Sequence, residues 1–212
     1  MGVNYAGVVH IAFEVIRIMI FEQLSLIPVA VFFITSLLLV VYTDWKVNLT
    51  ALFVQYLGVF WLTALVWPTG LAAVKLVAGW MAGAVLTASQ VNLDEYRLAT
   101  SYSLRIFRVL SAGVVWLVVF NVVPLTQDYL PVPPAILVGG ILLIGMGLLQ
   151  LGMTTRTFHV ILGLLTVFSG FEMIYAAIEV SVLVAGLLAA VNLGLAAAGA
   201  YIMSKPEAGG LL

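Results

Sequence analysis

Long, uninterrupted apolar runs fill most of this 212-residue chain and leave few folds open to it. Seven of them, at about residues 24–42, 47–67, 69–88, 106–125, 135–152, 157–178 and 180–203, approach the ~20 residues with which an α-helix crosses hydrocarbon. The runs are continuous rather than alternating, which argues against barrel strands. The chain is therefore predicted to be an all-α, polytopic transmembrane helical bundle.

The composition supports a membrane environment and limits the chemistry of the chain. Charged residues make up 8% of it and hydrophobic residues 64%, whereas soluble domains average about 25% charged residues. With no cysteine, two histidines and no basic cluster, the chain is expected to hold no metal or cofactor and to bind no nucleic acid. No hydrolase or nucleotide-binding motif occurs, so we expect no catalytic centre of its own.

Short polar or proline-containing segments separate the apolar runs, at residues 43–46, 67–70, 89–105, 128–134 and 154–156. The junction near Glu179 has neither proline nor glycine, and it fits either a tight turn or a broken helix. The chain is thus divided into an N-terminal helix at 1–22, a single transmembrane domain at 23–205 and a short C-terminal tail at 206–212.

The N-terminal segment allows two interpretations. His10, Glu14 and Arg17 recur at i, i+4 and i+7, so they share one face of a helix that is otherwise apolar. Such a helix would either lie in the membrane interface as an amphipathic helix or form an eighth span whose polar stripe faces protein.

The basic residues predict how the chain lies in the membrane. With seven spans, one side carries most of them and the other side carries Arg17 at most. The positive-inside rule makes the first side cytoplasmic and places the C-terminus there, in a multi-pass protein of the cell's inner (cytoplasmic) membrane. The residues on this side are Lys46, Arg97, Arg105, Arg108, Arg156 and Lys205.

A faint internal repeat relates the two halves of the chain. A shift of 112 positions aligns residues 24–88 with 135–203, and the lengths of spans and loops match. Four spans separate equivalent helices, so the halves would have the same orientation in a 3+1+3 architecture, with the span at 106–125 as the connector.

Ionisable residues inside the apolar runs are the best indication of function, because each is costly in hydrocarbon unless it faces a partner or water. Glu172 lies about fifteen residues into its span, at helical spacing from Ser169, Tyr175 and Glu179. Desolvation favours the neutral form of a carboxyl group, which lets it take up and release a proton. Glu172 is predicted to be a proton or ion relay. The alternative is a protonated side chain that bonds a neighbouring helix.

Lys75 and Glu179 are expected to be the electrostatic partners of this relay. Lys75 lies seven residues into the third span, where it either pairs with Glu172 or Glu179 or extends toward the interface. Glu179 ends its span, and the alternative is that it is simply solvated. Three further side chains are candidates for supporting the relay: His159, Tyr175 and Asn192.

Small, polar and aromatic residues predict how the helices pack. Gly79 and Gly83 form a small-xxx-small motif that permits close approach of another helix. Polar residues expected to bond between helices are Asn192, Gln55, Thr63, Asn121 and Gln150. Aromatic residues expected to anchor the chain at the interfaces are Trp45, Trp67, Tyr42 and Tyr129.

Residues 156–200 carry a resemblance to known membrane subunits. They read RTFHVILGLLTVFSGFEMIYAAIEVSVLVAGLLAAVNLGLAAAGA, with Gly-x-Glu in the middle of one helix and an Ala/Gly/Leu-rich helix after it. This resembles the small K-type subunit of complex I, the related antiporter C-type subunit and the hydrogenase-4 component E type, whose length suits the whole chain. The resemblance implies that Glu172 is the helix-borne glutamate of a relay in a membrane arm. The K-type pattern has a second glutamate deep in the following helix, which here offers only Asn192.

These observations predict a non-catalytic membrane subunit of a multi-subunit ion- or proton-translocating complex, of complex I-like, hydrogenase-like or antiporter-like type. Its partners would be other integral membrane subunits and the lipid bilayer. Two other functions stay open. One is a structural or scaffolding subunit in which Lys75 and Glu172 form an internal pair. The other is a stand-alone small-solute transporter built on the repeat.

Overall fold

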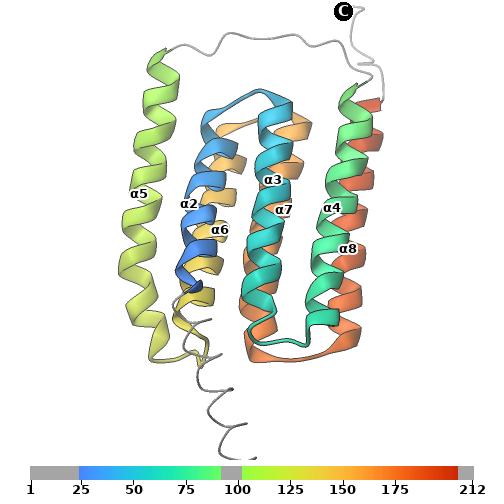
Figure 1. Ribbon diagram of the computed structural model, residues 1–212. Helices are drawn as coiled ribbons and strands as arrows, with labels where there is room; N and C mark the ends of the chain where they lie inside the picture. Colours follow the sequence, from blue (N-terminus) through green and yellow to red (C-terminus); the bar gives the residue numbers. More distant parts are fainter. Residues whose placement is uncertain (1–23, 92–101, 205–212) are drawn as a thin grey trace, which may run out of the picture.

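Helices and short connections make up the part of the chain that the structure describes. The computed structural model describes residues 24–91 and 102–204. Its helices are α2 (Leu26–Val41), α3 (Trp45–Thr63), α4 (Thr69–Val91), α5 (Tyr102–Gln127), α6 (Pro134–Met153), α7 (Thr157–Ile178) and α8 (Val182–Ser204) (Figure 1). Each of them coincides with one of the predicted apolar runs. The predicted helix at 1–22 and the tail at 206–212 lie outside the described residues.

Five of the described helices, α4 to α8, are long and apolar enough to cross a membrane, as expected of a multi-pass membrane protein. The 16 residues of α2 extend only about 24 Å. The α3 helix carries more polar residues, but its Asn48, Gln55 and Thr63 are fully buried inside the protein. That all seven of the described helices span the membrane therefore stays a prediction.

One predicted helix end is wrong, because α3 stops at Thr63 and not at residue 67. The backbone after Thr63 tightens to i→i+3 hydrogen bonds at Leu65 and Val66. Pro68 disfavours helical geometry at the preceding Trp67. These residues form a turn that returns the chain into α4.

The connections also differ in length from the predicted ones. The polar stretch 89–105 is partly helical, since α4 continues to Val91 and α5 begins at Tyr102. At Glu179 the chain makes a tight turn, with residues 179–181 outside any helix. The second of the two interpretations of this junction, a broken helix, is wrong, because α7 and α8 lie side by side (Figure 1).

The helices form two layers (Figure 1). In one layer α2, α3 and α4 follow one another, and in the other α6, α7 and α8 do. Across the layers α2 packs on α6, α3 on α7 and α4 on α8, while α5 stands outside, against α6 and α2. Equivalent helices of the expected 3+1+3 arrangement therefore face each other. The repeat itself stays a prediction.

One end of the bundle carries most of its described basic residues. The connections at 42–44 and 154–156 lie there, together with the start of α5 and the last turns of α4 and α8 (Figure 1). We term it the basic end, because Lys46, Arg105, Arg108 and Arg156 all belong to it. Both α3 and α7 begin at this end and run in the same direction.

The α6 and α7 helices approach so closely that their backbones touch at glycines. A Cβ on Gly170 would lie 2.5 Å from the carbonyl oxygen of Gly140, and one on Gly147 would lie 2.8 Å from that of Gly163. Backbone atoms cannot move aside as a flexible side chain can. The two helices can therefore pack in this way only with glycine at these positions.

The predicted Gly79/Gly83 motif has a different neighbour. A Cβ on Gly79 would collide with the ring of Tyr56, and one on Gly83 would lie 2.7 Å from the ring of Phe53. Both rings belong to α3. The motif thus makes room for aromatic side chains rather than for a second backbone.

Replacing Gly170 with alanine is expected to lower the free energy of unfolding by about 1–3 kcal/mol, because the added methyl group overpacks the contact with α6. Thermal unfolding in detergent, followed by circular dichroism, measures the loss. Gly194→Ala in α8 is the matched control, since nothing lies within 4 Å of its added Cβ. Its stability should stay at or slightly above that of the wild type. Equal effects of both substitutions would contradict the α6–α7 contact.

Candidate functional site

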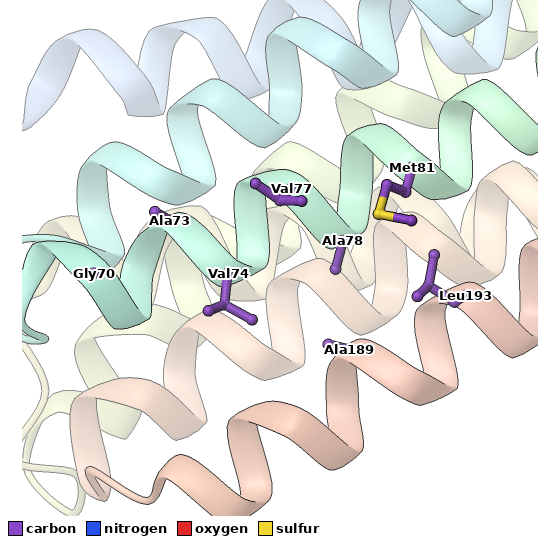
Figure 2. A pocket seen from close by; sticks show the side chains of 8 residues that line it. All are labelled: Gly70, Ala73, Val74, Val77, Ala78, Met81, Ala189 and Leu193. Carbon is purple, nitrogen blue, oxygen red and sulfur yellow. The ribbon is translucent and has the colours of Figure 1, made fainter.

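A groove between α4 and α8 lies on the bundle surface and offers no group for chemistry. It encloses about 370 Å³, and every residue that lines it is apolar (Figure 2). Val77 and Met81 on its rim are more than half exposed, at 55% and 52%. The candidate site is instead in the interior of the bundle, where polar side chains gather.

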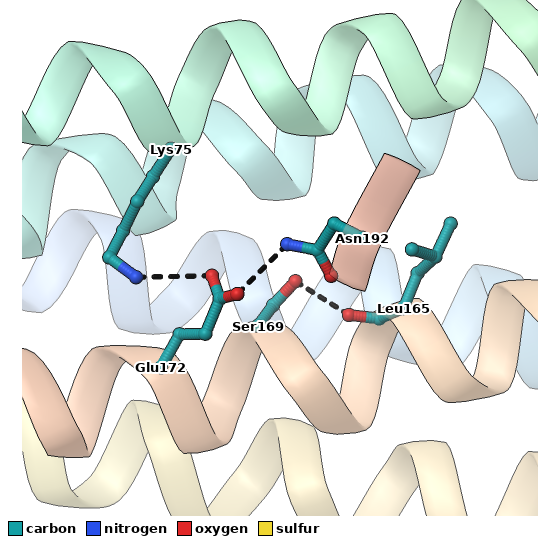
Figure 3. Close-up of polar contacts among 5 residues, drawn as sticks. All are labelled: Lys75, Leu165, Ser169, Glu172 and Asn192. Atoms are coloured by element: carbon teal, nitrogen blue, oxygen red, sulfur yellow. Dashed lines mark hydrogen bonds and ion pairs between the residues drawn. The ribbon is translucent and has the colours of Figure 1, made fainter. Parts of the chain in front are cut away.

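An ion pair between Lys75 of α4 and Glu172 of α7 forms the centre of this interior site. The Lys75 Nζ lies 3.1 Å from Glu172 Oε2, and the two side chains are 2% and 1% exposed. Figure 3 shows them meeting between their helices. Lys75 therefore points into the bundle, and the alternative in which it extends toward the interface is wrong.

Asn192 of α8 completes the cluster. Its Nδ2 donates a hydrogen bond of 2.9 Å to Glu172 Oε1, and its side chain is 1% exposed (Figure 3). Both carboxylate oxygens of Glu172 are thus bonded, one by Lys75 and the other by Asn192. Three helices each contribute one residue to this site.

Trp67 lies against the ammonium group of Lys75. The Lys75 Nζ is 5.2 Å from the centre of a Trp67 ring, within the range of a cation–π interaction. Trp67 is 3% exposed and packs with Ala176 and Ala185, so its predicted role as an interfacial anchor is wrong. The apolar contacts of this ring help to exclude solvent from Lys75.

A second polar cluster is buried close to the basic end. The Nε2 of His159 lies 3.2 Å from Nδ2 of Asn48, and Gln150 Nε2 donates to the His159 carbonyl oxygen at 3.1 Å. Asn48 Nδ2 also donates to the Tyr42 carbonyl oxygen at 3.1 Å. An amide nitrogen can only donate, so this contact is a hydrogen bond in the His159 tautomer whose Nε2 accepts and whose Nδ1 carries the proton. His159 is only 7% exposed and therefore does not sit in open solvent.

Between the two clusters, α3 and α7 face each other with polar groups. Gln55 Nε2 lies 3.4 Å from Thr166 Oγ1, and both residues are buried. The pairs Asn48–His159 and Gln55–Thr166 have the same separation of 111 positions. The two helices therefore lie parallel and in register.

Tyr56 and Ser169 continue this polar face toward Glu172. Both side chains are fully buried, Tyr56 on α3 and Ser169 on α7. The Ser169 hydroxyl donates to the Leu165 carbonyl oxygen at 2.7 Å (Figure 3). Its oxygen therefore remains able to accept a further hydrogen bond.

Glu179 and Tyr175 lie apart from the buried pair. Glu179 is exposed where α7 ends, and it accepts a hydrogen bond of 3.2 Å from the Tyr175 hydroxyl. The expectation that Glu179 partners Lys75 and Glu172 is wrong, because Lys75 points instead at Glu172. Glu179 corresponds to the solvated alternative.

The polar residues expected to bond between helices behave differently from one another. Asn192, Gln55 and Gln150 each form a hydrogen bond with another helix, as expected. Asn121 is exposed and bonds the Leu117 carbonyl oxygen of its own helix, so that expectation is wrong. Thr63 is buried, and its hydroxyl has no partner within the described residues.

The His, Asp and Glu side chains of the described ranges, 24–91 and 102–204, lie apart from one another. Among those residues no three side chains of His, Asp or Glu gather into a group that could hold an ion.

Comparisons with known proteins gave no match. No protein-family model, curated protein or solved structure matches the chain. The geometry of the interior residues is therefore the basis for assigning a function.

The pair of Lys75 and Glu172 can change its protonation in the bundle interior. A proton that moves across the 3.1 Å hydrogen bond converts the charged pair into a neutral one. A proton taken up from outside the pair leaves Glu172 neutral beside a charged Lys75. The ion pair is then lost, and the electric field in the bundle changes. Asn192 can bond the carboxyl group in either form, because its amide both donates and accepts.

Several residues of this interior are not evident as site residues from the sequence. Asn48 contacts His159 and Thr166 contacts Gln55, but neither Asn48 nor Thr166 is conspicuous in the sequence. Trp67 resembles an interfacial anchor because it precedes Pro-Thr-Gly. The spacing does contain a signal. Asn48 and Gln55 are seven positions apart, as are His159 and Thr166, which puts each pair on one helix face.

Proposed function

We propose that the chain is an integral membrane subunit of a multi-subunit ion- or proton-translocating complex, in which Glu172 takes up and releases a proton. The observation that carries this proposal is the buried ion pair, with Lys75 Nζ 3.1 Å from Glu172 Oε2 and both side chains at most 2% exposed. Removing two charges from water is costly even when they meet. Leucine and methionine would fill the same space without that cost, so a functional role accounts for the pair.

The distribution of charge supports a particular orientation of the subunit. Within the described residues, every lysine and arginine except Lys75 belongs to the basic end. By the positive-inside rule the basic end faces the cytoplasm of a cell whose inner membrane holds the protein. Ser204, the last residue of α8, would then be on the cytoplasmic side, and the C-terminus with it.

The outer helix α5 supports assembly with other membrane subunits. Only 17% of an apolar 18-residue stretch of this helix is buried, and its exposed side chains include Phe107, Leu110 and Phe120. Lipid or a neighbouring subunit would cover this surface. The resemblance of residues 156–200 to K-type, antiporter C-type and hydrogenase component E-type subunits favours a complex I-like, hydrogenase-like or antiporter-like assembly.

A structural or scaffolding subunit is the second candidate. The observation in its favour is that Lys75, Glu172 and Asn192 already satisfy one another, as a purely structural cluster would. In that case the cluster fixes the mutual positions of α4, α7 and α8 and moves no proton.

Purification of the native protein in a mild detergent, with mass spectrometry of everything that stays bound, tests the assembly. We expect antiporter-like or redox subunits to co-purify in fixed stoichiometry. A lone monomer or a homo-oligomer that moves a solute in liposomes would contradict the proposal and favour the stand-alone transporter. Stable binding to membrane proteins with no role in ion transport would favour the scaffold.

A further inference from the structure

Several buried polar atoms on α3, α7 and α8 have no hydrogen-bond partner within the described part of the chain. Five of them are Asn48 Oδ1, Gln55 Oε1, Tyr56 OH, His159 Nδ1 and Asn192 Oδ1. These side chains are at most 7% exposed. Buried polar atoms in native proteins almost always have a partner, and where the protein supplies none, an ordered water is the usual one.

Of the nine such atoms in the described residues, these five lie between the basic end and Glu172, and the other four belong to Thr63, Trp67, Arg108 and Trp116. Four of the five belong to what we term the seam, the facing surfaces of α3 and α7 formed by Asn48, Gln55, Tyr56, His159, Thr166 and Ser169. The seam begins at His159 near the basic end and reaches Glu172 thirteen positions later. With a rise of 1.5 Å per residue this is about 20 Å. The fifth atom, on Asn192, lies beside Glu172 itself.

The side chains of the seam cannot form a continuous hydrogen-bonded chain without an additional component. Successive pairs across the seam, Asn48–His159 and Gln55–Thr166, are seven positions apart, or about 10 Å along the helices. A single hydrogen bond spans about 3 Å. Atoms without a partner lie along these intervals and can bond water, such as Gln55 Oε1, which accepts, and the Tyr56 hydroxyl, which can donate and accept.

We infer that a file of water molecules runs along the seam and connects His159, near the basic end, with Glu172. The water satisfies the unpartnered oxygen and nitrogen atoms, and it gives the buried carboxylate a hydrogen-bonded path to one end of the bundle. This inference rests on the proposed function, because it names the side from which Glu172 receives its protons. Thr63 and Trp67, beyond Glu172, also carry one unpartnered atom each, but the paired polar groups lie on the side of the basic end.

The accessibility of single cysteines to silver ions tests the inference, since the wild-type chain has no cysteine. Ser169→Cys replaces one oxygen with sulfur in the seam and opens no cavity. Ala112→Cys in α5 is the control, because Ala112 is equally buried at 0%, lies within an apolar cluster and is about as far from the basic end. The full-length variants in lipid nanodiscs are treated with silver ions, quenched and denatured, and the thiols that remain are counted with a maleimide by mass spectrometry.

We expect silver to react with Ser169→Cys at least about tenfold faster than with Ala112→Cys. Adding Asn48→Leu, which replaces a polar side chain near His159 with an apolar one of similar size, should slow the reaction at Ser169→Cys. Thr166→Cys, one turn nearer to His159, provides the same readout if Ser169→Cys does not fold. Equal rates in the seam and the control, or a rate that Asn48→Leu leaves unchanged, would overturn the inference.

These outcomes can be separated from a failure of the proposed function, since silver accessibility requires no transport. A seam that excludes silver, in a complex whose translocation depends on Glu172, would overturn only the water file. A seam that admits silver, in a complex that translocates normally without Glu172, would overturn the proton-carrying role and leave the water file in place.

Discussion

Replacing Lys75 with methionine is expected to lower the free energy of unfolding by about 3–5 kcal/mol. The substitution removes the ammonium group 3.1 Å from Glu172 Oε2 and leaves a carboxylate that is 1% exposed without its counter-charge. An ion pair at the membrane surface would cost at most about 1 kcal/mol to break, because water replaces the lost partner. The burial of both side chains is thus the reason for the large expected effect.

The double variant Lys75→Met/Glu172→Gln is the matched control for this prediction. Methionine fills the space of the lysine stem, and the glutamine carbonyl can still accept the hydrogen bond from Asn192 Nδ2. No unpaired charge is left in the bundle, so the stability should return to within about 1–2 kcal/mol of the wild type. Thermal unfolding in detergent gives both values. A loss below about 1 kcal/mol for Lys75→Met alone would show that the pair is not buried as described.

The sequence contains most of what is needed to place the helices. Apolar runs near 20 residues and the breaks at Pro68, Pro131 and Pro133 correspond to the observed helices to within a few positions. The ends are less predictable, because local bonds decide them. At Thr63 the backbone changes to i→i+3 hydrogen bonds, and at residue 91 the α4 helix continues into a stretch whose polarity indicates a loop.

The candidate site is predictable only in part. A glutamate, a lysine and an asparagine inside apolar runs are conspicuous, but the sequence does not say which of them meet. Lys75 and Glu172 are 97 positions apart, and only the packing of α4 and α8 on α7 brings them together. The same packing leaves Glu179, seven positions after Glu172, on the exposed end of α7.

Residues that look ordinary in the sequence also take part. Trp67 has the composition and position of an interfacial anchor, yet the turn after α3 directs its ring onto Lys75. The glycines of α6 and α7 are separated by seven positions in each helix, and their close contact becomes apparent only when the two helices are aligned. Both features depend on contacts between distant segments, which local patterns do not encode.

The central claim is that Glu172 carries protons. Its most direct test is proton translocation by the intact complex in which Lys75→Met/Glu172→Gln replaces the wild-type chain. The measurement uses sealed native membrane vesicles and a pH-sensitive dye, with assembly checked by co-purification of the partner subunits. We predict normal assembly and translocation reduced to the background of vesicles without the complex. A second variant, Glu172→Asp, keeps a carboxylate and should retain part of the activity. Translocation at the wild-type rate by the assembled double variant would contradict a proton-carrying role for Glu172 and leave the buried pair as a structural element.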